Sequence, residues 1–381
     1  MPNNNPVAAK SIAEHKKLKG KISICAKKPL RNLADLSIYY TPGVGAVASY
    51  LAAHKNEMRN LTIKNNCVAV ISDGSAVLGL GNIGPEGALP VMEGKAMLFK
   101  AFAGVDAFPI VLNTQDTEEI IQTVKNIAPV FGGINLEDIS APRCFEIENR
   151  LIEMLDIPVM HDDQHGTAIV VLAALLNALK VVKKNLKQSK IVIAGAGAAG
   201  NAVAKLLLQE GAGDIILVDS KAIISRDRQD LDPFKKELAA KTNKRDISGP
   251  LKKGIESADV LIGVAKAGLF TSEHIKSMAQ KAIVFALANP IPEIMPDIAK
   301  KAGAYVVATG RSDFPNQINN VLGFPGIFRG ALDNNVKKIT TEMKVKAAKK
   351  LAALVKNPKP DFIVPSAFDK RVAKAVASVI R

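Results

Sequence analysis

Four acidic residues follow two apolar segments of the sequence, each at the point where a strand is expected to end. Glu137 and Asp138 follow the first segment, Asp162 and Asp163 follow the second, and a helix is expected between them over residues 142–155. Two parallel strands joined by a crossover helix place their carboxyl ends at the same edge of a sheet, so these carboxylates should meet. Crowded carboxylates repel one another unless a proton or a cation lies among them, and hard oxygen ligands suit Mg²⁺ or Mn²⁺. Spacing alone does not separate a metal site from the alternative, which is solvated loop charges or helix caps.

A glycine-rich segment at residues 195–200 carries the clearest nucleotide signal. It follows a strand expected over residues 190–194 and precedes, in order, a helix over residues 201–209, a strand over residues 214–218 and Asp219. In this pattern the glycines permit a tight turn, a close approach to a pyrophosphate and close helix–strand packing, while the acid binds the adenine ribose. The phosphates lie on the amino terminus of the helix, where free N–H groups favour anions. The cofactor-binding residues expected here are Gly195, Ala196, Gly197, Ala198, Ala199, Gly200 and Asp219.

Apolar segments typical of buried parallel strands alternate with helical segments along the chain, which predicts an α/β fold. We expect two domains, residues 1–161 and residues 162–381, the second a Rossmann-type doubly wound domain whose carboxyl-terminal helices fold back on the first. Strands are expected over residues 67–72, 108–112, 130–134, 157–160, 190–194, 214–218, 260–264, 282–287 and 304–308. Helices are expected over residues 7–19, 46–56, 89–102, 116–127, 142–155, 168–182, 201–209 and 341–355, with irregular chain over residues 20–35.

The composition is that of a globular protein with a basic surface. The chain has 381 residues, of which 48% are hydrophobic and 23% charged, and its formal net charge is +15. The bases are scattered, Trp is absent and aromatic residues make up only 4%, so we expect a surface that attracts anionic metabolites and no nucleic acid partner. Three separated cysteines fit a reducing, cytoplasmic location. A polar, lysine-rich start predicts no secretion signal, and the apolar segment at residues 168–182 is short for a membrane span.

Seven short motifs occur in one order along the chain. They are Tyr-Thr-Pro-Gly-Val at residues 40–44, Glu-Gly-Lys at 93–95, Asn-Leu-Glu-Asp at 135–138, His-Asp-Asp-Gln-His-Gly-Thr-Ala at 161–168, Gly-Ala-Gly-Ala-Ala-Gly at 195–200, Ala-Asn-Pro at 288–290 and Asn-Gln-Ile-Asn-Asn at 316–320. On these motifs the chain closely resembles the malic enzymes, and its length is similar to that of their short bacterial and archaeal members. The resemblance implies oxidative decarboxylation of L-malate to pyruvate and CO₂ with NAD or NADP and a divalent metal. It also suggests a homodimer or a dimer-based oligomer.

The resemblance also implies a role for each site residue. Malate's hydroxyl and carboxylate would chelate the metal, Lys95 would act as the base and Tyr40 would protonate the enolate. Burial beside a cation should lower the pKa of Lys95 enough for this role. Without the resemblance, Lys95 is better interpreted as a solvated helix residue and Tyr40 as a packing residue beside Tyr39. The implied metal ligands are Glu137, Asp138 and Asp163, and the implied contacts to substrate or cofactor come from Asn289 and Asn319, with Asn320 beside them.

Two points stay open in the sequence. Larger relatives carry an arginine for the substrate carboxylate after the Asp-Gly turn, whereas this chain has Ser75 and Ala76 there. In this chain the substrate carboxylate would be bound either by the metal together with the asparagines or by a basic residue from another part of the sequence. Asp219 favours NAD because an acid disfavours a 2′-phosphate, but Lys221 is close enough in sequence to accommodate that phosphate.

Three other functions fit parts of the pattern. A malolactic enzyme uses similar residues but releases lactate without net cofactor reduction. An amino-acid dehydrogenase also pairs a lysine with a Rossmann domain, but it needs no clustered acids. A non-catalytic dinucleotide sensor needs neither the base nor the metal ligands.

Overall fold

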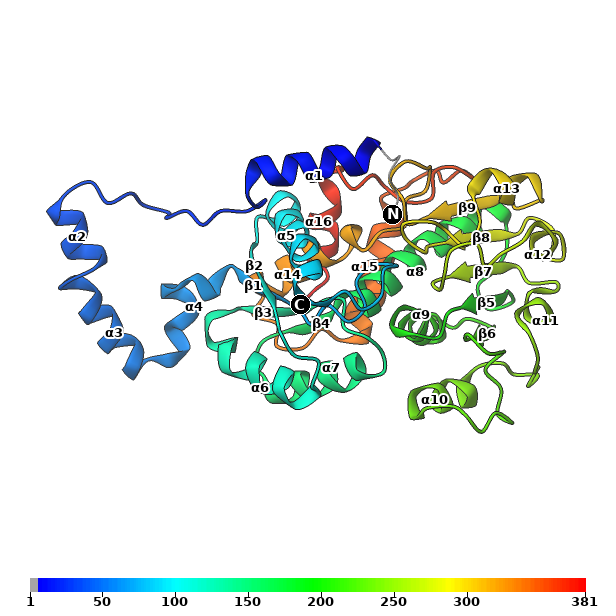
Figure 1. Cartoon of the computed structure of the whole chain (residues 1–381), viewed down its shortest axis with the longest axis horizontal. Helices are drawn as coiled ribbons and strands as arrows, with labels where there is room; N and C mark the ends of the chain where they lie inside the picture. The colour runs from blue at the N-terminus through cyan, green and yellow to red at the C-terminus, as the bar shows by residue number, and fades with distance from the viewer. Residues whose placement is uncertain (1–5) are drawn as a thin grey trace.

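The computed structural model describes residues 6–381, which form two parallel β-sheets flanked by helices (Figure 1). The first sheet has the strand order β2-β1-β3-β4 and the second β6-β5-β7-β8-β9. This confirms the predicted fold class, because β5 lies inside the second sheet with the chain winding outward on both sides, as in a Rossmann-type domain. The strands are β1 (Cys67–Ser72), β2 (Asp106–Val111), β3 (Gly133–Leu136), β4 (Val159–His161), β5 (Lys190–Ala194), β6 (Asp214–Val218), β7 (Val260–Gly263), β8 (Ile283–Ala286) and β9 (Val306–Thr309).

The strands β3 and β4 end in register, which positions the residues that follow them. Leu136 pairs with His161 in this parallel pair. The crossover helix α7 (Arg143–Met154) lies within one residue of its predicted limits at each end. The acidic residues that follow the two strands therefore leave the sheet at the same edge.

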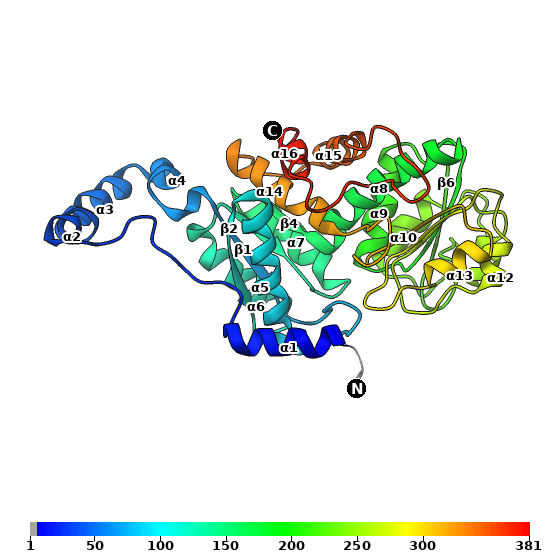
Figure 2. The ribbon, with the colours of Figure 1, turned by 90° about the horizontal axis from the view of Figure 1, so that it is seen from above.

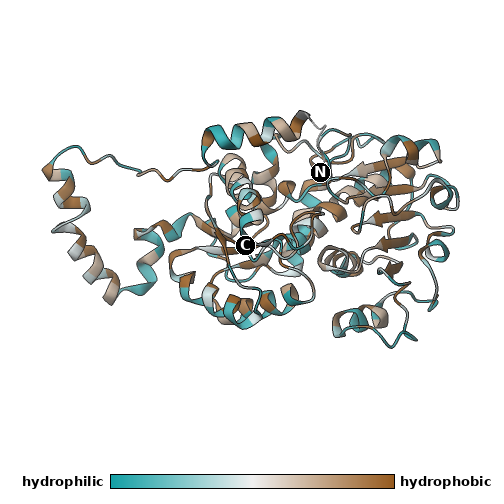
Figure 3. Ribbon diagram, in the orientation of Figure 1, coloured by the Kyte–Doolittle hydropathy of each residue, from teal (hydrophilic) through white to brown (hydrophobic). Residues whose placement is uncertain are grey.

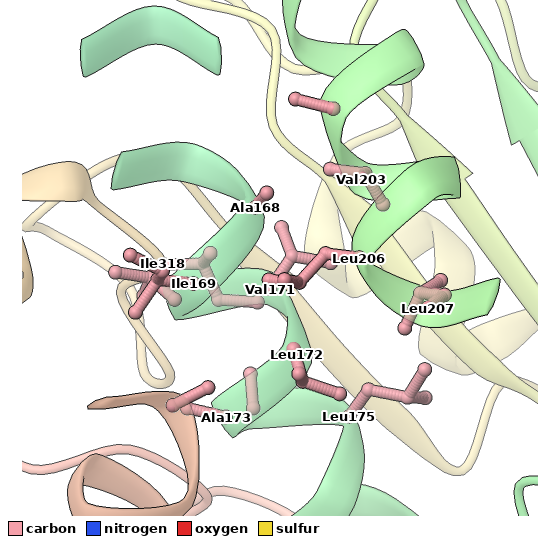
Figure 4. Close-up of a cluster of buried hydrophobic side chains, with 14 of the residues drawn as sticks. Ala168, Ile169, Val171, Leu172, Ala173, Leu175, Val203, Leu206, Leu207 and Ile318 are labelled. Carbon is pink, nitrogen blue, oxygen red and sulfur yellow. The ribbon is translucent and has the colours of Figure 1, made fainter. Parts of the chain in front are cut away.

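One long helix, α8 (Asp162–Val182), lies between the two sheets. By length and composition alone it would be apolar enough to cross a membrane, but most of its residues are buried inside the protein. It packs against α9 (Ala198–Gln209) and α15 (Thr341–Ala353). Figure 4 shows Val171 and Leu175 of α8 beside Leu206 and Leu207 of α9.

The carboxyl-terminal helices return to the first sheet, as expected. Both α14 (Phe324–Asp333) and α16 (Arg371–Ala377) contact α5 (Gly84–Ala103). The ring of Phe99 on α5 meets those of Phe324 and Phe328 edge to face, with centroid separations of 4.7 and 5.5 Å. This aromatic packing holds α14 beside the first sheet.

A pair of helices near the amino terminus projects from the rest of the molecule (Figures 1 and 2). We call residues 33–53 the arm; it consists of α2 (Leu33–Tyr39) and α3 (Gly43–Ala53), and none of the residues of these two helices is buried. The prediction of irregular chain up to residue 35 is wrong, because Asn32 caps α2 by accepting a hydrogen bond from the backbone N–H of Asp35.

Several other predicted boundaries differ from the structure. The helix α5 begins at Gly84 rather than residue 89, and α8 begins at Asp162 rather than residue 168. The strand β3 starts at Gly133 because residues 128–130 form a 3₁₀ helix. The strand β2 is half-buried rather than buried because it lies at the edge of its sheet. The expectation about a secretion signal falls partly on residues 1–5, which lie outside the described residues.

The remaining elements are α1 (Pro6–Leu18), η1 (Lys55–Glu57), α4 (Met58–Leu61), η2 (Ile63–Asn65), α6 (Thr117–Ile127), η3 (Ala128–Val130), α10 (Pro233–Lys241), α11 (Leu251–Ile255), α12 (Ser272–Lys276), α13 (Pro296–Lys301) and η4 (Asn320–Leu322).

Candidate active site

Three acidic side chains converge at the edge of the first sheet. One carboxylate oxygen each from Glu137, Asp138 and Asp163 lies within 4.8 Å of the other two. The backbone at Asp138 has a positive φ of 54°, and its N–H donates a 2.8 Å hydrogen bond to Oδ2 of Asp163. Asp163 belongs to the first turn of α8, although the helix was expected to begin only at residue 168. The strand–helix–strand unit therefore brings together the three predicted metal ligands.

The electrostatics of this cluster suit a divalent cation. Burial raises the pKa of Glu137, Asp138 and Asp163, and at Asp138 the neighbouring carboxylates raise it further. Oδ2 of Asp138 is buried and has no hydrogen-bond partner among the described residues. A hard cation such as Mg²⁺ or Mn²⁺ would satisfy that oxygen and remove the mutual repulsion, so the residues fit the implied metal.

Lys95 lies on α5 directly beside this cluster. Its Nζ is 2.8 Å from Oε1 of Glu137 and 2.5 Å from Oδ2 of Asp162, and it lies 4.0 Å from the centroid of the Phe324 ring. Burial alone would lower the pKa of Lys95, but the carboxylates of Asp162 and Glu137 outweigh that effect and raise it. The expected lowering of this pKa requires a cation beside Lys95 and stays a prediction; without the cation, the two carboxylates favour the protonated form of Lys95.

Asp162 is the partner of Lys95 and lies outside the group of three carboxylates. Burial raises its pKa to about 7, although the charge of Lys95 opposes the shift. A Cβ atom on Gly166 would lie 1.8 Å from Oδ1 of Asp162, so only glycine leaves room for this carboxylate inside the first turns of α8. The sequence did not predict the Lys95–Asp162 pair, because it depends on where the tertiary fold places α5 relative to the first turn of α8.

A buried glutamate holds the segment that carries Asp163. Glu148 on α7 accepts hydrogen bonds from the backbone N–H of His161 at 2.7 Å and from Nε2 of Gln164 at 3.0 Å, and its Oε2 lies 3.0 Å from Nε2 of His165. The sequence reasoning missed Glu148. The signal was present, because this acid occupies a buried position in an otherwise apolar face of an amphipathic helix, where a charge needs partners.

A cleft of about 680 Å³ opens over Lys95 and the carboxylate cluster, and its lining includes segments that follow strands of both sheets. Lys21, from the segment after α1, also lines it, whereas Ser75 does not. Tyr40 is not among the lining residues; it lies at the end of α2 on the arm, and 63% of it is exposed. The predicted residues in its wall are Lys95, Glu137, Asp138, Asp163, Ala199, Asn289 and Asn319, with Asn320 beside them.

The glycine-rich segment has the geometry that its pattern predicts. Gly195 has a φ of +114°, which L side chains rarely adopt, and a Cβ atom on Gly200 would lie 1.8 Å from the carbonyl oxygen of Gly195. Around Gly197 a Cβ atom would meet nothing within 4 Å, so the backbone is open to a ligand. A second cavity of about 240 Å³ is lined by Ala196, Gly197 and Asp219.

Asp219 is engaged by two cations. Its carboxylate accepts hydrogen bonds from Arg228 at 2.9 and 3.1 Å and from Lys235 at 3.3 Å. Burial opposes ionisation, but the bonds from Arg228 prevail and lower the pKa of Asp219 to about 2. The side chain of Lys221, which the sequence suggested for a 2′-phosphate, instead pairs with Asp230 at 2.7 Å. The basic residue that contacts Asp219 is therefore Arg228, together with Lys235.

Comparisons with known proteins match both halves of the chain to one family. Residues 19–152 match the model of the malic enzyme N-terminal domain, and residues 164–380 match that of the malic enzyme NAD binding domain. The chain is 57% identical to the NAD-dependent malic enzyme of Geobacillus stearothermophilus, over 95% of this chain and 76% of the relative. It is 54% identical to the bifunctional malic/malolactic enzyme of Bacillus subtilis, over 96% of this chain and 90% of the relative. The crystal structure of the NAD-dependent malic enzyme from Thermotoga maritima superposes with a TM-score of 0.94 at 49% identity, covering 97% of this chain and 98% of that one.

Proposed function

Since the chain belongs to the malic enzyme family, we propose that it oxidises L-malate with NAD or NADP and decarboxylates the product to pyruvate and CO₂, in a reaction that requires Mg²⁺ or Mn²⁺. The observation that carries this proposal is the convergence of three buried carboxylates and Lys95 in a cleft whose wall includes Ala199 of the glycine-rich segment. No dinucleotide sensor needs that arrangement.

The metal would be held by Glu137, Asp138 and Asp163. When bound, it would acidify the C2 hydroxyl of malate and stabilise the negative charge that develops on this oxygen. Lys95 would receive the hydroxyl proton on Nζ once it had itself lost a proton. Oδ2 of Asp162, which lies 2.5 Å from Nζ, can accept the proton that Lys95 loses. Burial raises the pKa of Asp162 to about 7, which suits a group that accepts and returns a proton.

Other polar groups in the lining of the cleft would orient malate. Asn289 and Asn319 line the cleft and offer amide groups to the substrate or the nicotinamide. We propose that Lys21 binds the substrate carboxylate. The basic residues in the described lining of the cleft are Lys21, Lys95 and His15, and Lys95 already pairs with two acids. Lys21 would then do the work of the arginine that larger relatives place in the loop of Ser75.

The cofactor would extend from the large cleft to the small cavity beside Gly197. Asp219 in that cavity supports NAD as the preferred cofactor, since it can accept hydrogen bonds from the ribose hydroxyls. Arg228 and Lys235 neutralise Asp219 and offer charge to a 2′-phosphate, so NADP should also be accepted.

A parallel spectrophotometric assay tests the proposal. L-malate and Mn²⁺ are supplied with NAD⁺ or NADP⁺, reduced cofactor is followed by absorbance, and pyruvate and lactate are measured at the end. Pyruvate formed in equal amount to reduced cofactor is the expected result. Lactate without reduced cofactor would indicate a malolactic enzyme, an activity that the name of the Bacillus subtilis relative includes. Malate oxidation that persists in a chelator would exclude the metal, and cofactor reduction in a chelator with an amino acid in place of malate would favour an amino-acid dehydrogenase.

We also propose a cytoplasmic location and a division of the chain into a substrate- and metal-binding domain, residues 1–161, and an NAD(P)-binding domain, residues 162–381. Three free cysteines support the location. The two separate sheets on either side of residue 162 support the division.

A further inference from the structure

A buried carboxylate lies behind two of the segments that line the cleft. Glu293 is 0% exposed; its Oε1 accepts a 2.9 Å hydrogen bond from the backbone N–H of Ala265, and its Oε2 accepts one of 3.0 Å from that of Ala288. Both alanines line the cleft, whereas Glu293 does not. One side chain therefore holds together the segment that follows β7 and the segment that follows β8.

The fold makes room for this carboxylate at the end of β7. A Cβ atom on Gly263, the last residue of that strand, would lie 2.4 Å from Cδ of Glu293 and 2.6 Å from its Oε1. The backbone of Glu293 is held too, because its carbonyl oxygen accepts a 3.0 Å hydrogen bond from the N–H of Phe270. Contacts of both the side chain and the backbone therefore set the position of the carboxylate relative to the cleft.

This carboxylate lies in apolar surroundings without a counter-ion. Figure 3 shows β7 and β8 in the brown of apolar residues, and both strands are buried. Burial raises the pKa of Glu293, but the two backbone N–H groups oppose that shift and satisfy the ionised form. Among residues 6–381 no basic side chain forms an ion pair with Glu293; Arg311, which donates to the carbonyl oxygen of Pro290, pairs with Asp313. A buried negative charge with no partner acts strongly on any charge that enters the cleft beside it.

The strand order indicates which part of the cofactor would lie at this end of the cleft. Asp219 follows β6 on one side of β5, whereas β7 and β8 lie on the other side. A dinucleotide lies across the carboxyl edge of such a sheet, so with its adenosine at Asp219 and its pyrophosphate at Gly197 the nicotinamide end would extend towards β7 and β8. The nicotinamide ring carries a positive charge in the oxidised cofactor and no charge in the reduced one.

We propose that Glu293 is a positioning residue which, through the segments of Ala265 and Ala288, makes the cleft bind the oxidised cofactor in preference to the reduced one. This inference rests on the proposed function. The carboxylate attracts the positive ring of NAD⁺, and the neutral ring of NADH gains nothing from it. Such a preference suits an enzyme that takes up the oxidised cofactor and must release the reduced one.

Calorimetric titrations of one protein with NAD⁺ and with NADH test the preference. Glu293→Gln keeps the shape of the side chain and removes its charge, so we expect the Kd for NAD⁺ to rise roughly 10-fold more than the Kd for NADH. Glu293→Asp keeps the charge, so the ratio of the two Kd values should stay that of the wild type even where both affinities fall. Glu256→Gln is the matched control, because this exposed glutamate precedes β7 at the opposite edge of the sheet. It should change neither Kd.

A second neutral variant separates charge from support of the backbone. The amide of glutamine turns an N–H donor towards one of the two backbone N–H groups and can disturb the fold, whereas Glu293→Met is of similar length and carries no donor. Its ratio of Kd values should change in the same direction as that of Glu293→Gln. Neutral variants that weaken both cofactors equally would show that Glu293 only supports the backbone, and the proposal would be overturned. A wild type that binds both cofactors but oxidises no malate would contradict the proposed function alone, because these titrations contain no malate.

Discussion

Replacing Asp163 by asparagine removes one proposed metal ligand with little change in shape. The three ligand oxygens lie within 4.8 Å of one another, so any two of these carboxylates that are ionised together repel by at least about 3 kcal/mol at an effective dielectric constant of about 20. The substitution removes the repulsion in which the ionised Asp163 takes part, and the new amide oxygen can still accept the hydrogen bond that the Asp138 N–H now donates. We therefore expect the metal-free Asp163→Asn protein to be at least as stable as the wild type.

Mn²⁺ should then separate the two proteins. At a concentration about 100 times its Kd, the ion stabilises the wild type by about 2.7 kcal/mol, which raises the melting temperature by roughly 3–4 °C for a chain of 381 residues. If losing one carboxylate weakens binding on the order of 100-fold, the stabilisation falls to about 0.4 kcal/mol, or about 0.5 °C. Thermal melts at pH 8, with and without Mn²⁺, measure both quantities.

Asp162→Asn is the neighbouring control in this experiment. Asp162 lies outside the group of three ligands and pairs with Lys95, so its replacement should lower the rate of turnover while the Mn²⁺-induced rise in melting temperature persists. If Mn²⁺ stabilises Asp163→Asn as much as the wild type, the metal does not bind at this edge of the sheet and the central assignment is refuted.

Four further outcomes follow from the same geometry. Lys95→Ala should slow malate oxidation by about 10²–10⁴-fold, while fluorescence titration still detects NAD⁺ binding; near wild-type turnover would exclude Lys95 as the base. Lys21→Met should raise the KM for malate by about 10-fold with the KM for NAD⁺ unchanged, and an unchanged KM for malate would leave the carboxylate clamp elsewhere. Arg228→Ala should lower kcat/KM for NADP⁺ relative to NAD⁺ by about 10-fold or more, because a 2′-phosphate loses its bidentate partner; a constant ratio would show that Arg228 does not contact the cofactor. Folding raises the pKa of Asp138 to about 9, so the protonated carboxyl stabilises the metal-free protein at low pH and this stabilisation is lost as the pH rises towards 9. The melting temperature should therefore fall between about pH 5 and pH 9 unless Mn²⁺ is present.

The sequence predicted those parts of the structure that depend on local pattern and topology. Strands buried on both faces form continuous apolar segments, so residues 67–72 were bounded correctly. The convergence of Glu137 and Asp163 followed from a strand–helix–strand unit, in which connectivity alone brings two chain segments to one edge.

Other parts depend on packing between segments that are distant in the sequence. Nothing near Lys95 in the chain indicates that Asp162 will lie 2.5 Å from it, because the contact is set by the position of α5 beside α8. The same holds for Arg228, which reaches Asp219 through the loop after β6 while the nearer Lys221 turns to another acid. The location of Tyr40 on a projecting arm was equally hidden, since Pro42 and Gly43 allow a turn but do not set the direction in which it points.

The helix α8 has a consequence for how the molecule unfolds. Its side chains belong to one continuous hydrophobic core that also contains Val68 of β1 in the first sheet and Ile193 of β5 in the second. Neither sheet can lose its packing without exposing the helix that the other one covers, so the two domains should melt together as one cooperative unit. A cofactor bound at Gly197 would then also protect the acidic edge of the first sheet from local opening.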